Sequence, residues 1–223
     1  MQIFWKGQSC FQIIAAPEKN NPVKIVIDPF SEEAGLRLPK LEADVLLTTH
    51  GHADHNNIKG VDPSAGSGQG PFLIQGPGEY EVKGVYVKGI PSFHDDKEGK
   101  ERGNNTIYVI EVEDLKICHL GDLGQKELTK EQMEEIGEID VLMLPVGGVY
   151  TLAAKEALQV MSQVEPKITI PMHYAVPKLK YKLEGVDKFL KILGIKSVAP
   201  EEKLTIKKKD MTEEEARVVV LNP

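Results

Sequence analysis

Short apolar runs with alternating polar positions fill the first half of the chain, and they predict β-strands because side chains alternate between the two faces of a strand. These strands are expected at residues 3–5, 11–15, 24–28, 44–48, 72–74, 80–82, 84–87, 106–112 and 115–119. Beyond residue 125, apolar residues recur at helical spacing between further short strands. Helices are expected at 125–136, 151–164 and 186–193, and strands at 140–144, 168–170, 204–206 and 218–221. This pattern is typical of an α/β fold.

The chain has 223 residues, enough for one α/β domain with a sizeable core, and we expect a single domain over residues 1–223. Its formal net charge of −7 disfavours nonspecific binding of nucleic acid, which needs a basic face. Cys10 and Cys118 lie among apolar neighbours and are interpreted as buried, reduced thiols. The sequence has no secretory signal pattern and no apolar run near the roughly 18 residues of a membrane span. We therefore expect a cytoplasmic protein without a membrane partner.

Candidate chemistry concentrates in residues 49–55, whose sequence is THGHADH. Three of the six histidines of the chain stand there, directly after a predicted strand. Neutral imidazole is the commonest protein ligand of metal ions. Strand alternation places His50 and His52 on one side, whereas Asp54 and His55 turn to the other, where a short helix is expected to begin near Asp54. This loop could therefore serve two metal ions.

The remaining polar candidates also stand at the ends of predicted strands. Asp28 and Asp122 each follow a strand, and the other three histidines, His94, His119 and His173, lie at or just past strand ends. Each of these histidines alone is more often a satisfied structural side chain than a ligand. Together with the THGHADH loop they indicate a metal site, because α/β folds assemble their sites at the carboxyl ends of strands.

The THGHADH segment resembles the T-H-x-H-x-D-H motif of the metallo-β-lactamase superfamily, and His94, Asp122 and His173 follow in the order of that family. The runs IDPF, GNNTIYVIEV, CHLGD, DVLMLPVGG and PMHY are similar to its branch of small metal-dependent hydrolases, which includes ascorbate-6-phosphate lactonase. The resemblance implies a four-layer αβ/βα sandwich, with two mixed sheets packed face to face and helices outside. It also implies a lactonase-like, metal-dependent hydrolase.

The resemblance further implies a dinuclear metal centre. Its ligands would be His50, His52 and His94 for the first ion, Asp54, His55 and His173 for the second, and Asp122 as a bridge. Asp28 matches a family aspartate that supports a ligand histidine, a task that fixes the tautomer of the ring. Gln8 stands where many relatives carry histidine, so the chain departs from the family pattern there. Nitrogen-rich ligation favours zinc as the divalent ion, although manganese or iron would also fit the carboxylates.

A pair of cations can hold a bridging water as hydroxide near pH 7 and can polarise the attacked group. We therefore expect hydrolysis of a small ester, lactone, amide or phosphoester by a metal-bridging hydroxide that Asp54 orients. His119 is expected to be a supporting residue or a proton donor, or else a core histidine. Candidate substrate contacts, in loops that the resemblance places near the metals, are Asn104, Asn105, Tyr150 and Thr151.

Three alternative functions use the same fold. A metal-dependent phosphodiesterase or nuclease would be expected to carry a basic cleft and extra domains, which this acidic sequence does not indicate. A redox protein of the fold, such as a diiron oxygen or nitric oxide reductase, usually has a carboxylate where His52 stands and an added flavin-binding domain. A non-catalytic metal-binding protein would be separated from an enzyme by an activity screen. The expected partner is a small-molecule substrate, and a homo-oligomer is compatible with the sequence.

Overall fold

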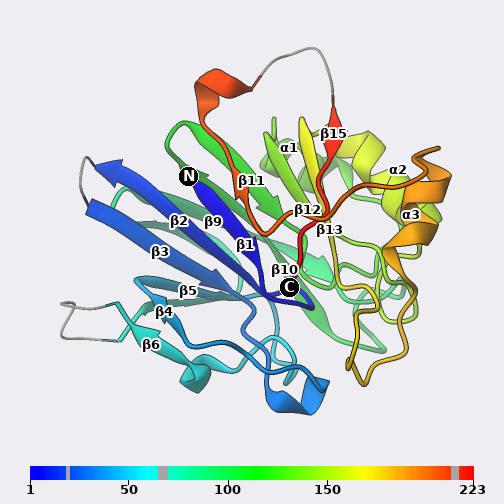
Figure 1. Ribbon diagram of the computed structural model, residues 1–223, viewed down its shortest axis with the longest axis horizontal. Helices are drawn as coiled ribbons and strands as arrows, with labels where there is room; N and C mark the ends of the chain where they lie inside the picture. Colours follow the sequence, from blue (N-terminus) through cyan, green and yellow to red (C-terminus); the bar gives the residue numbers. More distant parts are fainter. Residues whose placement is uncertain (19–20, 65–69, 212–215) are drawn as a thin grey trace.

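Two mixed β-sheets form the centre of the computed structural model, which describes residues 1–18, 21–64, 70–211 and 216–223 (Figure 1). The first sheet has the strand order β14-β1-β2-β3-β5-β7. Its strands are β1 (Gln2–Trp5), β2 (Phe11–Glu18), β3 (Asn21–Ile27), β5 (Val45–Thr48), β7 (Phe72–Gln75) and β14 (Leu204–Thr205). Strands β3, β5 and β7 are parallel to one another, whereas β14, β1, β2 and β3 pair antiparallel.

The second sheet has the strand order β15-β13-β12-β11-β10-β9-β8. Its strands are β8 (Gly78–Val82), β9 (Val85–Phe93), β10 (Asn104–Val112), β11 (Leu115–His119), β12 (Val141–Pro145), β13 (Ile168–Met172) and β15 (Arg217–Val218). The first four form an antiparallel meander, and β11, β12, β13 and β15 run parallel. Strands β9, β11 and β13 therefore point the same way and end at one edge of the sheet.

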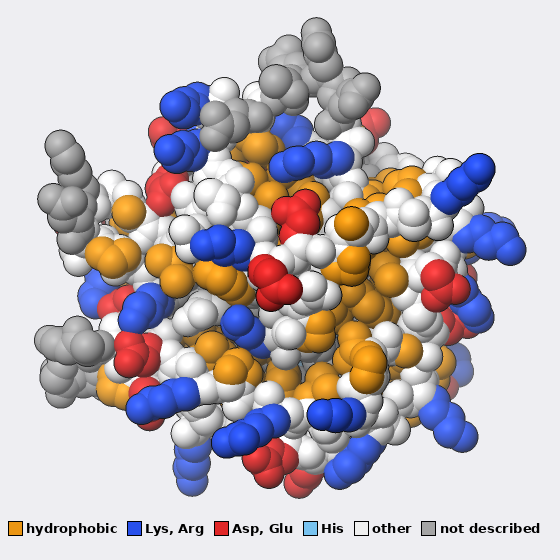
Figure 2. Space-filling model, in the orientation of Figure 1, with side chains coloured by type: hydrophobic (Ala, Val, Ile, Leu, Met, Phe, Trp, Pro, Cys, Tyr) orange, Lys and Arg blue, Asp and Glu red, His pale blue; other side chains and the backbone are white. Residues whose placement is uncertain are grey.

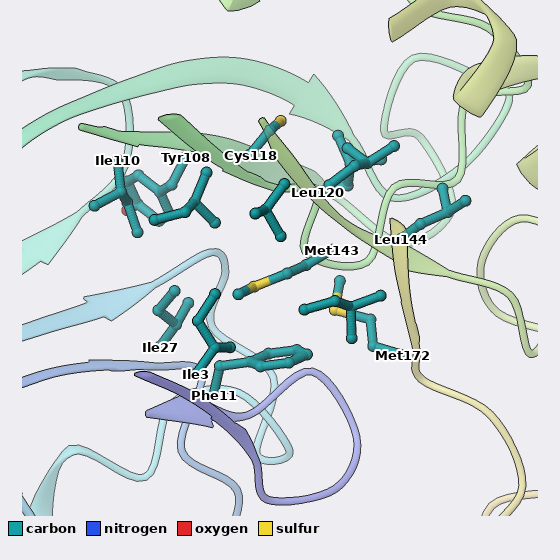
Figure 3. Packing of buried hydrophobic residues seen from close by; sticks show 14 of the residues in the cluster. Ile3, Phe11, Ile27, Tyr108, Ile110, Cys118, Leu120, Met143, Leu144 and Met172 are labelled. Carbon is teal, nitrogen blue, oxygen red and sulfur yellow. The ribbon is translucent and has the colours of Figure 1, made fainter. Parts of the chain in front are cut away.

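The main hydrophobic core lies between the two sheets. Ile3, Phe11 and Ile27 of the first sheet face Tyr108 and Met143 of the second, and all five are fully buried (Figure 3). Burial of each large apolar side chain contributes about 1.5–3 kcal/mol. The continuous apolar runs of β3 and β5 follow from burial on both faces, because alternate residues of these strands belong to a second, smaller core on the outer side.

Different structures cover the outer faces of the two sheets. Helices α1 (Lys130–Ile136), α2 (Ala154–Val164) and α3 (Val186–Ile192) pack outside the second sheet (Figure 1). The first sheet is covered by a two-stranded sheet of β4 (Leu41–Ala43) and β6 (Val61–Pro63), and by the 3₁₀ turns η1 (Glu32–Ala34) and η2 (Ile58–Gly60). A third turn, η3, spans Lys208–Asp210. The predicted α/β sandwich of two mixed sheets is confirmed.

Some predicted elements differ in their bounds. The helix expected from residue 125 begins at Lys130, because Thr129 and Gln132 form a capping box in which Thr129 Oγ1 accepts the Gln132 N–H at 3.2 Å and Gln132 Oε1 accepts the Thr129 N–H at 3.0 Å. No α-helix begins near Asp54, where the chain makes a turn before η2. The prediction of a helix there was wrong, and strands β4 and β6 were not predicted.

The molecular surface carries both signs of charge. Figure 2 shows lysine and arginine side chains interspersed with acidic ones over the viewed face rather than gathered into one patch. Among the described residues, none of the helices has the length and apolar character that crossing a membrane requires. The viewed face therefore offers no continuous basic surface of the kind that binds phosphate backbones nonspecifically.

Candidate metal centre

The polar side chains at the carboxyl ends of strands from both sheets converge on one site. Residues 49–55 follow β5, and His94, Asp122 and His173 follow β9, β11 and β13. Two hydrogen bonds fix the end of β5 against β10: the Thr106 N–H donates to the Thr49 carbonyl at 3.0 Å, and Tyr108 Oη donates to the Thr48 carbonyl at 2.9 Å. The packing of the two sheets thus sets the distance between candidate ligands that are far apart in the sequence.

Two groups of donor atoms lie close enough to hold metal ions. In each group every residue offers one atom, and these atoms lie within 4.8 Å of one another. The first group is His50, His52 and His94, and the second is Asp54, His55, Asp122 and His173. Oδ2 of Asp122 lies 3.3 Å from Nε2 of His94, in the first group. The same oxygen lies 3.2 Å from Nε2 of His55 and of His173, so one carboxylate joins the two groups.

The donor set fits bound cations. Nε2 of His55, the nitrogen that faces Asp122, is buried without a hydrogen-bond partner among the described residues. An unpaired buried polar atom costs about 1–3 kcal/mol, so a buried nitrogen of this kind among carboxylates and imidazoles favours a bound cation. Imidazole nitrogens and carboxylate oxygens in this arrangement are the ligands that zinc and similar divalent ions prefer.

Burial and mutual repulsion keep most of these imidazoles neutral. The pKa of His50 is held far below 6.5 by burial and by the neighbouring imidazole of His55. Burial also lowers the pKa of His173. Burial by itself would lower the pKa of His55, but the Asp122 and Asp28 carboxylates raise it. Burial would raise the pKa of Asp122, yet the surrounding histidines, His173 first, hold it well below 3.8. His50 and His173 are therefore neutral donors and Asp122 is ionised, the forms that bind metal, whereas His55 would have to release a proton to a bound cation.

Asp28 supports the second group from strand β3. Its backbone has a left-handed φ of 49°, and its fully buried carboxylate accepts hydrogen bonds from the Thr49 N–H and Oγ1, both at 2.7 Å. The same carboxylate lies 2.9 Å from Nδ1 of His55. A proton on Nδ1 would donate to Asp28 and leave the lone pair of Nε2 pointing at Asp122. The structure thus places Asp28 behind a candidate ligand histidine.

The turn between β1 and β2 touches the centre from another side. Ser9 Oγ donates to Asp122 Oδ1 at 3.0 Å, and the Gln8 side-chain N–H₂ lies 3.5 Å from Asp54 Oδ2. Gln8 is fully buried, has a left-handed φ of 50°, and leaves its Oε1 without a partner among the described residues. Its carbonyl accepts the backbone N–H of His173 at 3.0 Å. This departure from the family pattern therefore lies in direct contact with the candidate ligands.

His119 lies one layer behind the donor atoms. Its ring is fully buried, and Nδ1 accepts the Gly121 N–H at 3.1 Å. Nε2 must then carry the proton, which it donates to the Ser9 carbonyl at 2.8 Å. Burial lowers the pKa of the ring below 6.5. Both nitrogens are occupied by backbone groups of the two loops that hold Asp122.

The four candidate substrate contacts lie in different surroundings. Asn105 is buried, donates to Ser92 Oγ and the Leu120 carbonyl, and accepts the Asp122 N–H at 3.0 Å, so its side chain is fully used within the protein. Asn104 is exposed at the start of β10. Tyr150 lines the cavity above the donor atoms, and Thr151 lines an adjoining hollow.

The cavity above the donor atoms has a volume of about 260 Å³. Its lining residues are His52, Asp54, His94, Glu101, Arg102, Asp122, Tyr150, His173 and Tyr181. Three of these, Glu101, Arg102 and Tyr181, were not named from the sequence. Two sequence features could have drawn attention to Arg102: it stands in the polar loop after His94, and it is one of just three arginines in the chain.

Comparison with known proteins agrees with the fold. The model of the beta-lactamase superfamily domain matches residues 2–173. A structure from Thermotoga maritima, described as a Zn-dependent hydrolase of the metallo-beta-lactamase superfamily, has 40% sequence identity and a TM-score of 0.75, and the match covers 99% of this chain and 97% of that one. The chain therefore belongs to the metallo-β-lactamase superfamily.

Curated relatives place it more narrowly. A UPF0173 metal-dependent hydrolase of Thermococcus onnurineus is 30% identical over 196 residues, covering 78% of this chain and 84% of the relative. One of Thermoplasma volcanium is 32% identical over 197 residues, covering 78% and 83%. The predictions that the chain belongs to this superfamily and is a metal-dependent hydrolase are confirmed.

Proposed function

We propose that this protein hydrolyses a small ester, lactone, amide or phosphoester at a centre of two divalent cations, with zinc as the first candidate. The observation that carries the proposal is the position of Asp122 Oδ2, which lies within 3.3 Å of a nitrogen in each ligand group. His50, His52 and His94 would hold one ion, Asp54, His55 and His173 the other, and Asp122 both. Two cations bound in this way would lower the pKa of a bound water towards neutrality and would act as a Lewis acid on the oxygen of the attacked group.

Asp54 would handle the proton of the attacking water. Its side chain is 15% exposed and lines the cavity, while its Oδ2 lies 3.7 Å from Nε2 of His55. In the reaction, the water oxygen bonds to the carbonyl carbon or to phosphorus, and the bond to the leaving group breaks. Asp54 would orient the water and accept its proton, and the Gln8 amide would keep the Asp54 carboxylate in place.

For His119 we propose a positioning role rather than proton transfer. Its two nitrogens join the Gly121 N–H to the Ser9 carbonyl, and Ser9 Oγ in turn contacts Asp122. A proton donor needs a free N–H that faces the substrate, which this ring does not have. Asn105 is proposed to act in the same way, through the Asp122 backbone. Of the four predicted substrate contacts, Tyr150 has the best-supported position, because it lines the cavity.

The cavity volume of about 260 Å³ supports a small-molecule substrate. A lactonase-like activity, a cytoplasmic location and a homo-oligomeric state remain predictions of the sequence. The dinuclear centre is tested by metal analysis of protein purified without a histidine tag and reconstituted with zinc. About two ions per chain are expected, and a content well below two would refute the dinuclear centre.

Catalysis is tested separately by screening esters, lactones, amides and phosphodiesters with the metal-loaded protein. Turnover is expected for at least one class and should vanish in Asp54→Ala, with the fold checked by circular dichroism. If the metal-loaded wild type turns over none of them, the protein is a metal-binding module without this hydrolase activity.

A further inference from the structure

Arg102 lies on the wall of the cavity above the donor atoms and has no acidic partner among the described residues. Among the described residues, no carboxylate lies within 4.0 Å of its guanidinium. Its polar side-chain contact is a long one, from Nη2 to the Val149 carbonyl at 3.4 Å. Its guanidinium carbon lies 5.7 Å from the centre of the Tyr150 ring. The guanidinium thus makes a cation–π contact with Tyr150, while most of its five N–H donors have no hydrogen-bond acceptor among the described residues.

Two charged residues near Arg102 already have partners of opposite charge. Glu101 also lines the cavity, but its carboxylate pairs with the Lys97 ammonium. Lys126, beside the adjoining hollow of about 190 Å³, pairs with Asp96 at 2.6 Å. What distinguishes Arg102 is its position: its guanidinium, without a carboxylate partner among the described residues, lines the cavity above the candidate metal ligands, where it could bind an anionic ligand.

The loop that carries Arg102 is held in shape by the buried carboxylate of Asp95. This carboxylate accepts four backbone N–H groups, from Lys97 and Gly99 to Oδ1 at 2.8 and 2.9 Å, and from Glu101 and Arg102 to Oδ2 at 3.0 and 2.7 Å. Such a ring of bonds fixes the backbone before any ligand arrives. A preorganised cation loses less entropy on binding than one on a mobile loop.

The facing wall is held in an unusual conformation. Val149 has a left-handed φ of 59°, a genuine outlier for a β-branched residue, although its side chain is 57% exposed and gains little from packing. Backbone strain of this kind costs about 1–3 kcal/mol and clusters at functional sites. Here it places Tyr150 between Arg102 and Tyr181, whose ring centre lies 6.2 Å from that of Tyr150.

We propose that Arg102 binds an anionic group, a carboxylate or a phosphate, at the end of the substrate remote from the bond that is cleaved. A planar guanidinium can donate two parallel hydrogen bonds to either anion. Tyr150 and Tyr181 would flank the connecting part of the substrate. The adjoining hollow is lined by Asp95, Asp96 and Glu156 and is a poorer place for an anion, which favours the metal side of Arg102. The proposal rests on the proposed hydrolase function for its catalytic meaning, but binding at Arg102 can be measured without turnover.

The binding experiment compares ligands with one and two anionic ends on the metal-loaded protein by calorimetry. Acetate would report binding at the metals alone, whereas succinate and 3-phosphonopropionate are chosen to contact the metals with one end and Arg102 with the other. The preference of the wild type for either two-ended ligand over acetate should fall by about 10–100-fold in Arg102→Gln, since a hydrogen bond to a charged group is worth about 1.5–3 kcal/mol. A larger loss of preference for 3-phosphonopropionate than for succinate in Arg102→Gln would indicate a phosphate subsite. A larger loss for succinate would indicate a carboxylate subsite.

Arg37→Gln is the matched control, because it removes the same charge from an exposed side chain that does not line the cavity. It should keep the wild-type preference. A wild type without preference for two-ended ligands, or an Arg102→Gln variant that keeps the preference, overturns the anion subsite. The ratio of kcat/KM for 4-nitrophenyl hydrogen glutarate to that for 4-nitrophenyl acetate should fall in parallel, mainly through KM. If the wild type shows the binding preference but no turnover, and Arg102→Gln loses that preference, the hydrolase function is refuted and the anion subsite stands.

Discussion

The carboxylate of Asp28 lies 2.9 Å from Nδ1 of His55, and both side chains are fully buried. This contact joins the end of β3 to the loop after β5. It orients the imidazole so that Nε2 faces Asp122 at 3.2 Å. The candidate metal centre therefore depends on a residue that would not touch the metal.

Asp28→Asn should lower metal affinity by about 10–100-fold, because the amide loses the charge and can offer only one acceptor to Thr49 and His55. Competition with a chromogenic chelator measures the affinity. Asp44→Asn is the matched control: Asp44 also accepts a backbone N–H, from Lys24 at 2.9 Å, but it stands before β5, at the end of the strand away from the histidines. Equal losses in both variants would mean that the effect of Asp28 is general destabilisation.

Gln8→Asn should lower kcat by about 10-fold on the best substrate found in the hydrolase screen. Asparagine tolerates the left-handed backbone of this position, but its side chain is one methylene too short to reach Asp54. The melting temperature should change little. Gln12→Asn, the same shortening on β2, is the control. An unchanged kcat would show that Gln8 does not hold the Asp54 carboxylate.

Gly147→Ala should destabilise the protein by about 1–3 kcal/mol and weaken metal binding, because the new methyl carbon would lie 2.0 Å from the carbonyl oxygen of His173. One of the two backbones must move, and the His173 side chain moves with it. Urea unfolding and chelator competition measure the two effects. Gly70→Ala is the control and should show neither effect, because apart from its chain neighbours none of the described residues has an atom within 4 Å of the added carbon.

Asp95→Ala should loosen the loop that carries Arg102. Four backbone N–H groups would lose their acceptor, so the amides of Lys97, Gly99, Glu101 and Arg102 should exchange faster with deuterium. The preference for succinate over acetate should fall towards that of Arg102→Gln. Unchanged exchange at these amides would contradict the role assigned to Asp95.

Asp140 should make stability depend on acid pH. Burial by itself would raise its pKa, but the Lys208 ammonium and the Lys116 N–H, with Lys167, lower it below 3.8. A lowered folded-state pKa means that the contribution is fully present above about pH 4 and is lost as pH falls through the lowered value. Asp140→Asn should therefore cost about 1 kcal/mol at pH 7 and progressively less below pH 4.

Unfolding by urea across pH 2–7 measures that difference. Glu98→Gln, which breaks an exposed ion pair with Lys100, is the control and should change stability little at any pH. A cost of Asp140→Asn that stays constant down to pH 2 would contradict the assigned ion pairs.

The sequence by itself determined the strands of the two large sheets, because their apolar runs must be buried, but not the short strands β4 and β6. It also placed the polar side chains at strand ends. It also determined the superfamily and the set of candidate ligands, since THGHADH and the later histidines are local patterns. The start of α1 was within reach of sequence reasoning, because Thr129 and Gln132 carry a capping-box signal. A single domain over residues 1–223 stays a prediction.

Only the tertiary structure decided which of these side chains meet. His94, Asp122 and His173 come to the THGHADH loop because two sheets pack face to face, and no local pattern encodes the distance between them. The same packing turned Asn105 and His119 towards backbone partners and brought Arg102 beside the candidate metal ligands. Their roles depend on contacts between residues distant in sequence, which composition and periodicity do not specify.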